Sequence, residues 1–345
     1  MSLVGVRAPT PVIEFTLPPH LEAHEPPEAR GLRRDEVRLL VSYLDSGRLA
    51  HARFADLPRL LRAGDLVVVN VSATLPAAVV ARRTDGTEVA AHVSTRLPAG
   101  LTVVELRQVS ATAGETLALP EGGTLTVFAP YPGSSRLWVA RLDLPAPLPT
   151  YLVAWGRPIA YPYVRGEWPI EMYQTVYAAV PGSAEMPSAG RAFTPEILER
   201  LATRGIYLAS IVLHAGVASL EYDEPPYEEW FEVSHETAAA VARAQKHGGR
   251  IIAVGTTVVR ALESAVDTAG RPIASRGWTD RVVSPEHPPR LVNGLLTGFH
   301  EPKATHLAML AALAGRAHLH GAYRAALERG YLWHEFGDLH LLIPD

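Results

Sequence analysis

The chain has 345 residues and no cysteine, which excludes a disulfide framework, a thiolate zinc site, an iron–sulfur cluster and a cysteine nucleophile. Hydrophobic residues make up 48% and charged residues 20%, so we expect a folded protein of roughly two domains. The net charge of −4 is too small to attract nucleic acid by itself. The sequence predicts neither a signal peptide nor a membrane-spanning helix, and a cytoplasmic protein is expected.

The first half of the chain is rich in short strand-like runs. Residues 36–44 predict one strand, and residues 65–149 contain apolar runs separated by Gly-containing turns. Asp85-Gly86 lies between two of these runs and favours a β-hairpin. We therefore expect a small all-β barrel-like domain over residues 65–149, inserted near the N-terminus, followed by an extended Pro- and aromatic-rich connector over residues 145–169.

The second half of the chain repeats a different pattern. Residues 206–216, 250–266 and 291–315 each begin with a β-branched or leucine-rich strand that leads into a Gly-containing loop, and the last two continue into an amphipathic helix. This repetition predicts an α/β main domain with a largely parallel sheet, formed by residues 1–64 and 150–345. A further helix is expected between Thr194, at its N-cap, and Gly205, just past its end.

Polar residues and glycines follow the ends of these three strands. In open α/β sheets, ligands bind beyond the carboxyl ends of the strands. The residues placed there are 214–216, 255–257 and 297–303. The segment Gly255–Thr257 begins a helix and can bind an anion, although one of its threonines can equally serve as an ordinary N-cap. Arg260 and Glu263, three residues apart on that helix, can simply pair with each other.

Two histidines and one lysine stand out in these loops. His214 ends an apolar strand and is either a hydrogen-bonded core residue or a functional group. His300 shares a loop with Lys303, and the chain contains only one other lysine, Lys246. No carboxylate stands at a metal-ligand spacing from the remaining C-terminal histidines, so no bound metal is expected.

The connector interleaves aromatic residues with arginines. Such a pattern can stack unpaired bases and hold phosphates, and it can equally be a strap packed across two domains. The aromatic and basic residues concerned are Trp155, Arg157, Tyr161, Tyr163, Arg165 and Trp168.

Eight motifs, taken together and in order, resemble the S-adenosylmethionine:tRNA ribosyltransferase-isomerase family of queuosine biosynthesis. They are YQTVYA at 173–178, PGS at 181–183, PSAG at 187–190, FTPEIL at 193–198, LHAG at 213–216, AVGTTVVRALES at 253–264, TGFHEPKAT at 297–305 and FGD at 336–338. The resemblance covers nearly the whole chain, and it implies an α/β main domain with an inserted small β-barrel.

The resemblance also implies a reaction and its site residues. The ribosyl part of S-adenosylmethionine, a co-substrate, moves to a 7-aminomethyl-7-deazaguanine in tRNA, giving epoxyqueuosine with release of adenine and methionine and without a metal. The titratable candidates that match the motifs are His214, His300, Lys303 and Asp338. The implied substrate-binding residues are Tyr173, Gln174, Thr175, Ser188, Gly190, Gly216, Gly255, Thr256, Thr257, Arg260, Thr297, Phe299 and Thr305.

Several positions depart from the family's motifs. Ala192 replaces a histidine, Gly298 replaces an asparagine, and Glu224 and Tyr227 occupy the places of the family's H-x-M-H motif. Losing imidazoles changes what a pocket can protonate or hydrogen-bond. Two alternatives to the family's activity therefore remain, namely a paralogue that uses S-adenosylmethionine on a small-molecule acceptor and a non-catalytic nucleoside- or RNA-binding paralogue. The sequence leaves the oligomeric state undetermined.

Overall fold

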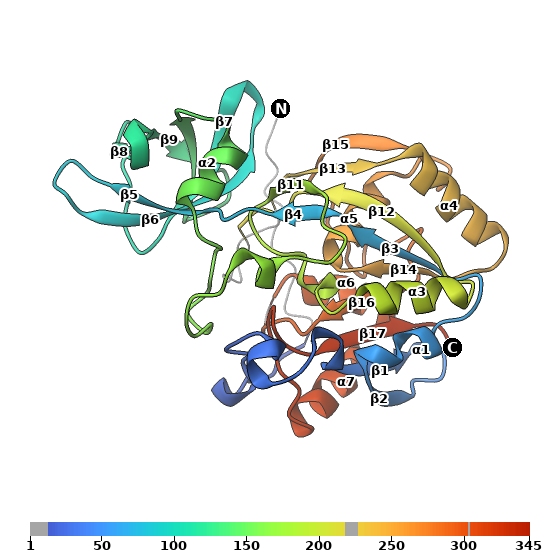
Figure 1. Cartoon of the computed structure of the whole chain (residues 1–345). Helices are drawn as coiled ribbons and strands as arrows, with labels where there is room; N and C mark the ends of the chain where they lie inside the picture. The colour runs from blue at the N-terminus through green and yellow to red at the C-terminus, as the bar shows by residue number, and fades with distance from the viewer. Residues whose placement is uncertain (1–12, 218–226, 303) are drawn as a thin grey trace.

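The computed structural model describes residues 13–217, 227–302 and 304–345. It contains one large sheet, one closed barrel and one two-stranded ribbon, with helices on both faces of the large sheet (Figure 1). None of its helices, within these described ranges, is long and apolar enough to cross a bilayer.

The large sheet has nine strands in the order β15-β13-β12-β3-β14-β16-β17-β1-β2. The strands are β1 (Arg38–Tyr43), β2 (Leu49–Arg53), β3 (Leu66–Asn70), β12 (Tyr207–Leu213), β13 (Glu229–Val233), β14 (Ile251–Val254), β15 (Ser275–Thr279), β16 (Gly294–Gly298) and β17 (Leu339–Ile343). The neighbours β12, β3, β14 and β16 run parallel, and so do β17 and β1, whereas the other pairs are antiparallel. The expectation of a largely parallel sheet is therefore corrected to a mixed sheet with a parallel centre.

The strand β3 lies in the middle of this sheet and not in the barrel, where we expected it. Its five residues are all buried, and alternate side chains belong to the hydrophobic clusters on the two faces of the sheet. An unbroken apolar run is what a central parallel strand needs, because both of its faces are covered. The boundary expected at residue 65 thus assigns this strand to the wrong unit.

The barrel closes from six antiparallel strands in the order β10-β7-β6-β5-β8-β9. They are β5 (Ala78–Arg82), β6 (Glu88–Arg96), β7 (Leu101–Leu106), β8 (Thr116–Ala118), β9 (Thr124–Pro130) and β10 (Leu137–Asp143). The Asp85-Gly86 hairpin is confirmed between β5 and β6. A ribbon of β4 (Ser72–Thr74) and β11 (Val180–Ser183) lies between the barrel and the large sheet (Figure 1).

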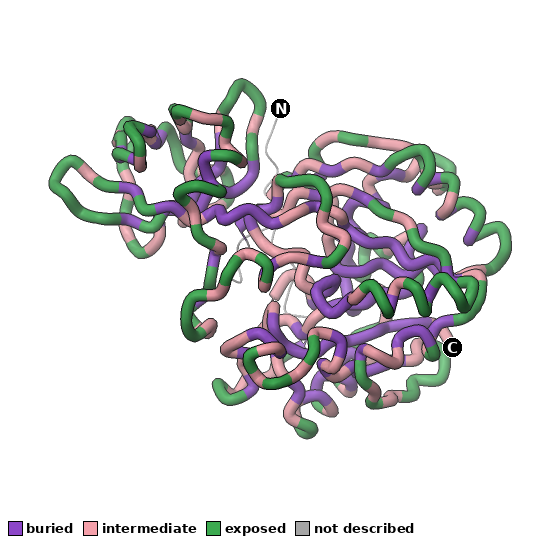
Figure 2. Tube along the Cα trace, in the orientation of Figure 1, coloured by how far each residue is buried: buried purple, intermediate pink, exposed green. Residues whose placement is uncertain are grey.

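Helices cover both faces of the large sheet. One face packs against α4 (His235–Lys246), α5 (Thr256–Ser264), α6 (His306–Ala314) and α7 (Arg316–Glu328), and the other packs against α1 (Leu57–Leu60) and α3 (Pro195–Thr203). Figure 2 shows the resulting band of buried backbone through the sheet. The connector is not fully extended, because α2 (Leu148–Trp155) forms there and buries Tyr151 and Leu152 against the barrel core.

Candidate functional site

A cavity of about 300 Å³ lies where the central parallel strands end, next to the loops that lead to the barrel. Its walls include residues that follow β12, β14 and β16, together with residues of the connector and of the segment before β17. Eleven of the residues expected on sequence grounds line it, namely Tyr173, Ser188, Gly216, Gly255, Thr256, Thr257, Arg260, Thr297, Phe299, His300 and Thr305. Segments that are far apart in the chain therefore surround one space.

The N-terminus of α5 faces this cavity. Gly255 is the N-cap, and its φ of 91° is one that side-chain-bearing residues rarely adopt. The expectation that a threonine caps this helix is wrong, because no side chain makes the cap hydrogen bond. Thr256 and Thr257 instead line the cavity beside the free N–H groups of the first turn, where the helix dipole favours an anion.

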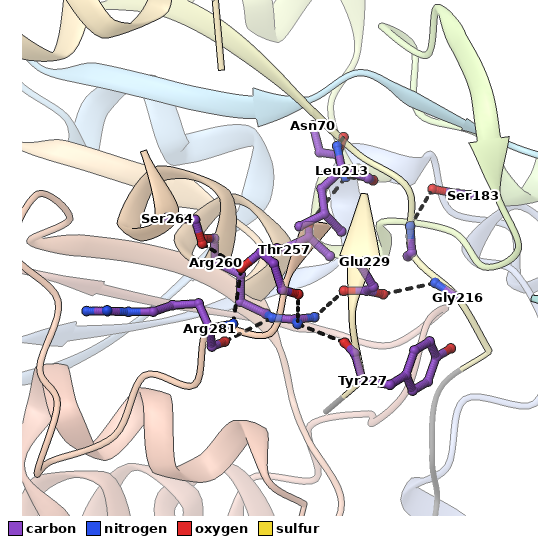
Figure 3. Close-up of polar contacts among 12 residues, drawn as sticks. Asn70, Ser183, Leu213, Gly216, Tyr227, Glu229, Thr257, Arg260, Ser264 and Arg281 are labelled. Atoms are coloured by element: carbon purple, nitrogen blue, oxygen red, sulfur yellow. Dashed lines mark hydrogen bonds and ion pairs between the residues drawn. The ribbon is translucent and has the colours of Figure 1, made fainter. Parts of the chain in front are cut away.

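A buried ion pair joins α5 to the strand β13 at the cavity wall. The guanidinium of Arg260 donates to one carboxylate oxygen of Glu229, and the other oxygen accepts from the backbone N–H of Gly216 at 2.9 Å (Figure 3). Arg260 also donates to the carbonyls of Tyr227 and Thr279 at 3.0 and 2.9 Å. This network fixes the loop after β12.

Glu263 has a different role from the one expected. Its carboxylate accepts from the backbone N–H groups of Arg290, Leu291 and Val292 at 2.8 to 3.0 Å. The expected pairing of Arg260 with Glu263 is therefore wrong. The partner of Arg260 is Glu229 on the strand β13, and a rule based on spacing within one helix does not find it.

His300 lies in the cavity wall with a second imidazole against it. Its Nε2 lies 2.9 Å from Oγ1 of Thr297, and its ring stacks on that of His306 with 4.7 Å between centroids. Burial, followed by the neighbouring His306 and His340, holds the pKa of His300 well below its usual range. Burial and Arg260 lower the pKa of His306 to about 4. Both rings are thus neutral at pH 7, the form in which an imidazole can act as a base, and burial disfavours their protonated form.

His214 has its side chain outside the cavity lining, although the residues that follow it, Ala215 to Val217, line the cavity. Its Nδ1 lies 2.8 Å from Oγ of Ser72, and its ring stacks on Trp230. A Cβ at Gly182 would lie 2.4 Å from this ring, so the ribbon strand β11 packs directly on it. Burial, with a smaller effect of Arg96, lowers its pKa to about 4. Its contacts place it in the packing between the ribbon and the sheet.

Asp338 also lies away from the cavity lining. Its carboxylate accepts from the backbone N–H of Arg38 at 2.7 Å, from the Arg38 guanidinium and from the backbone N–H of Leu332. This buried carboxylate connects the beginnings of β1 and β17. Lys303 and Glu224 lie outside the described residues, and the role of Lys303 stays a prediction.

The remaining expected residues, Gln174, Thr175 and Gly190, do not line the cavity and have structural contacts. Gln174 pairs its side-chain amide with the backbone of Thr74 at 2.7 and 3.0 Å, in the manner of an added strand. Thr175 is buried, and a Cβ at Gly190 would lie 2.0 Å from the hydroxyl of Tyr177. Of the positions that depart from the family motifs, Gly298 and Tyr227 line the cavity, whereas Ala192 is buried in the core.

A wall of tyrosines and carboxylates was not predicted as part of the site. Tyr163 donates to Glu335 at 2.6 Å, and Tyr161 donates to Glu185. All four residues line the cavity together with His334, whose ring stacks on Tyr163 with 3.7 Å between centroids. The aromatic pattern of the connector was the available signal, but its acidic partners stand far away in the sequence.

An α/β sheet with a cavity at its strand ends and a barrel beside it defines a ligand-binding protein of the α/β class. The family model described as "Queuosine biosynthesis protein" matches residues 11–342. The chain belongs to this family.

Named relatives span nearly the whole chain. The S-adenosylmethionine:tRNA ribosyltransferase-isomerase of Thermus thermophilus is 36% identical, covering 96% of this chain and 98% of the relative. Those of Moorella thermoacetica and Thermotoga maritima are each 34% identical with the same coverage. The crystal structure of S-adenosylmethionine tRNA ribosyltransferase from Thermotoga maritima has a TM-score of 0.54 and 28% identity, covering 96% of this chain and 100% of that chain.

Proposed function

We propose that this chain transfers the ribosyl moiety of S-adenosylmethionine to a 7-aminomethyl-7-deazaguanine in tRNA and isomerises it, giving epoxyqueuosine with release of adenine and methionine. Family membership supports this activity, because the relatives carry the name of that enzyme along the full length of the chain. The observation that carries the proposal is the meeting of three strand-end loops around one cavity.

The end of the cavity at α5 suits the methionine carboxylate of S-adenosylmethionine. The first N–H groups of the helix, the hydroxyls of Thr256 and Thr257 and the positive end of the helix dipole all favour an anion there. Arg260 adds positive charge, although Glu229 already balances it. We therefore assign the amino-acid part of the co-substrate to this end.

The proton chemistry falls to His300. The sulfonium acidifies the neighbouring C5′ hydrogens and leaves as neutral methionine, so one base that removes a C5′ proton is required. His300 is neutral at pH 7 because its pKa is lowered, and Thr297 fixes the direction of its ring. His214 and Asp338 act through packing and ion pairing, and we propose no proton transfer for them.

The activity is tested by adenine release. Purified protein and S-adenosylmethionine are incubated with tRNA that carries 7-aminomethyl-7-deazaguanine, and adenine and the modified nucleoside are measured by liquid chromatography. We expect adenine and epoxyqueuosine in equal amounts, and neither without tRNA. Adenine formed without tRNA would indicate another acceptor, and no adenine under any condition would contradict the proposed function.

The co-substrate site is tested by Gly255→Ala, with Gly270→Ala as a matched control. Both glycines have a positive φ, so alanine costs roughly 1–3 kcal/mol of backbone strain at either position. Only Gly255 holds the first turn of α5 at the cavity. We expect the Kd for S-adenosylmethionine, from thermal-shift titration, to rise by about tenfold or more in Gly255→Ala only. Equal affinity in the two variants would remove α5 from the co-substrate site.

A further inference from the structure

One end of the cavity differs from the rest in its chemistry. Tyr161 and Tyr163 stack with 5.7 Å between ring centroids, and His334 continues the stack on Tyr163 with an interplanar angle of 8°. Each tyrosine hydroxyl donates to a carboxylate, Tyr161 to Glu185 and Tyr163 to Glu335. We call these five residues the tyrosine–carboxylate wall.

The wall is negatively charged and has unused acceptor capacity. A carboxylate offers about four acceptor positions, and the Tyr163 hydroxyl and the backbone N–H of Glu335 use only part of them, so positions remain for a ligand. Burial raises the pKa of Glu335, and burial with the nearby Glu22 and Glu335 raises that of Glu301, another residue of this end. Burial thus penalises these negative charges, and a bound cation or N–H donor would relieve that penalty.

His334 provides an independent sign of a binding surface. Its side chain is 4% exposed, yet its Nε2 has no hydrogen-bond partner among the described residues. Its backbone has a φ of 74°, a strained value for a residue other than glycine. Its nitrogens lie 3.7 Å from Glu22 and 3.5 Å from Glu301, beyond hydrogen-bond distance. A strained, buried imidazole in a cavity wall, with one ring nitrogen that has no hydrogen-bond partner among the described residues, is typical of a functional position.

We propose that the tyrosine–carboxylate wall binds the acceptor base, with Glu335 accepting from the base and Tyr163 positioning that carboxylate. The proposal rests on the proposed function and adds to it the location of the second substrate. The ligand it fits is a planar, positively charged base with adjacent N–H donors. An aminomethyl-deazaguanine has this chemistry, because its guanine edge presents two neighbouring donors and its side chain carries an ammonium group.

The same chemistry disfavours adenine at the wall. The corresponding edge of adenine presents a ring-nitrogen acceptor, which a carboxylate repels. S-adenosylmethionine is thereby directed to the part of the cavity at α5, where the helix N-terminus and Arg260 favour its carboxylate.

The test compares two anticodon hairpins that differ in one base. One hairpin carries 7-aminomethyl-7-deazaguanine and the other carries adenine at the same position, and both Kd values are measured by fluorescence anisotropy. We expect the unchanged protein to prefer the first hairpin by about tenfold or more, as for hydrogen bonds to a charged group. In Glu335→Gln the ratio of the two Kd values should fall to about two, because the amide has an NH2 donor in place of one carboxylate oxygen acceptor.

Matched variants separate binding from folding. Glu167→Gln makes the same chemical change at a side chain that is 82% exposed, and it should leave the ratio unchanged. Tyr163→Phe keeps the ring stack and removes the hydroxyl, so it should lower the ratio by a smaller factor. If Glu335→Gln does not fold, Tyr163→Phe carries the test. The Kd for S-adenosylmethionine should be the same in all these proteins.

The outcomes also separate this proposal from the proposed function. A ratio that persists in Glu335→Gln and Tyr163→Phe, or no preference in the unchanged protein, would overturn the assignment of the wall even if adenine is released. Weaker binding of S-adenosylmethionine in Glu335→Gln with an unchanged hairpin ratio would also overturn it, because the wall would then belong to the co-substrate. Absence of adenine release alongside a normal hairpin preference would contradict the activity and not the wall.

Discussion

At the scale of single residues, the site depends on buried charges whose partners are far away in the sequence. The pair of Arg260 and Glu229 is buried, and each member holds backbone groups in addition to the other. Breaking such a pair leaves an uncompensated charge in the interior, which costs more than the pair itself contributes. An exposed pair lacks this penalty, because water solvates whatever remains.

Replacing Arg260 by alanine should therefore destabilise the protein strongly. We expect the free energy of unfolding to fall by about 3–5 kcal/mol, since Glu229 and three backbone carbonyls lose their donor. The measurement is a urea titration followed by circular dichroism. Arg271→Ala is the control, because its side chain is 78% exposed and, among the described residues, pairs only with Asp267 in the same turn region. Similar unfolding midpoints for the two variants would contradict this account.

At the scale of elements, local sequence rules determine some ends of helices and strands. Thr194 accepts from the backbone N–H of Ile197, Pro195 opens α3, and Gly205 follows its end with a φ of 71°, as the sequence predicted. Ser234 caps α4 in the same way. Such ends are predictable because the residues that form them are neighbours in the chain.

The cap of α3 gives a test on the same helix. Thr194→Ala should lower the free energy of unfolding by about 1 kcal/mol, since the N–H of Ile197 loses its acceptor. Thr203→Ala makes the same substitution at the other end, where the exposed hydroxyl donates to a carbonyl that the helix already uses. We expect a change within about 0.5 kcal/mol there. Calorimetry of both variants measures the difference, and equal losses would argue against the cap.

Contacts between residues far apart in the chain could not be predicted from the sequence. The runs LVVVN of β3 and AVVAR of β5 both predict strands, but only the second alternates between buried and exposed positions. A strand buried on both faces fits the centre of the sheet, and a strand buried on one face fits the barrel. The sequence shows this difference only when the residues at odd and even positions of each run are compared. The strand-end loops of the site could be predicted, because parallel strands end at one edge. Tyr163 and Glu335 could not be paired, since 172 positions separate them.

At the scale of the whole molecule, buried histidines determine how stability depends on pH. The pKa is lowered to about 4 in His214, His306 and His334, mainly by burial, and to about 3 in His340. In the unfolded chain, histidine titrates near pH 6.5. The unfolded state therefore binds more protons than the folded state between about pH 6.5 and 4, and stability is lost as the pH falls through that window.

Glu335 and Glu301 act in the opposite direction. Their pKa values are raised in the folded state, so their ionised forms lower the free energy of unfolding. This destabilisation becomes smaller as the pH falls and the carboxyls are protonated. Two raised carboxyls oppose a larger set of depressed histidines. The net expectation is a free energy of unfolding that declines from pH 7 to pH 5.

Removing one buried histidine should flatten this decline. Each such group contributes a slope of about 1.4 kcal/mol per pH unit where only the unfolded state is protonated. His340→Gln removes a ring that is 0% exposed and lies 2.8 Å from Ser42, so the slope between pH 6 and 5 should fall by about that amount. His320→Gln, at an exposed position on α7, should leave the slope unchanged. Urea titrations at several pH values measure both slopes, and because the comparison uses slopes, a constant packing loss in His340→Gln does not affect it. A decline as steep in His340→Gln as in the unchanged protein would show that His340 is protonated in the folded state as readily as in the unfolded state.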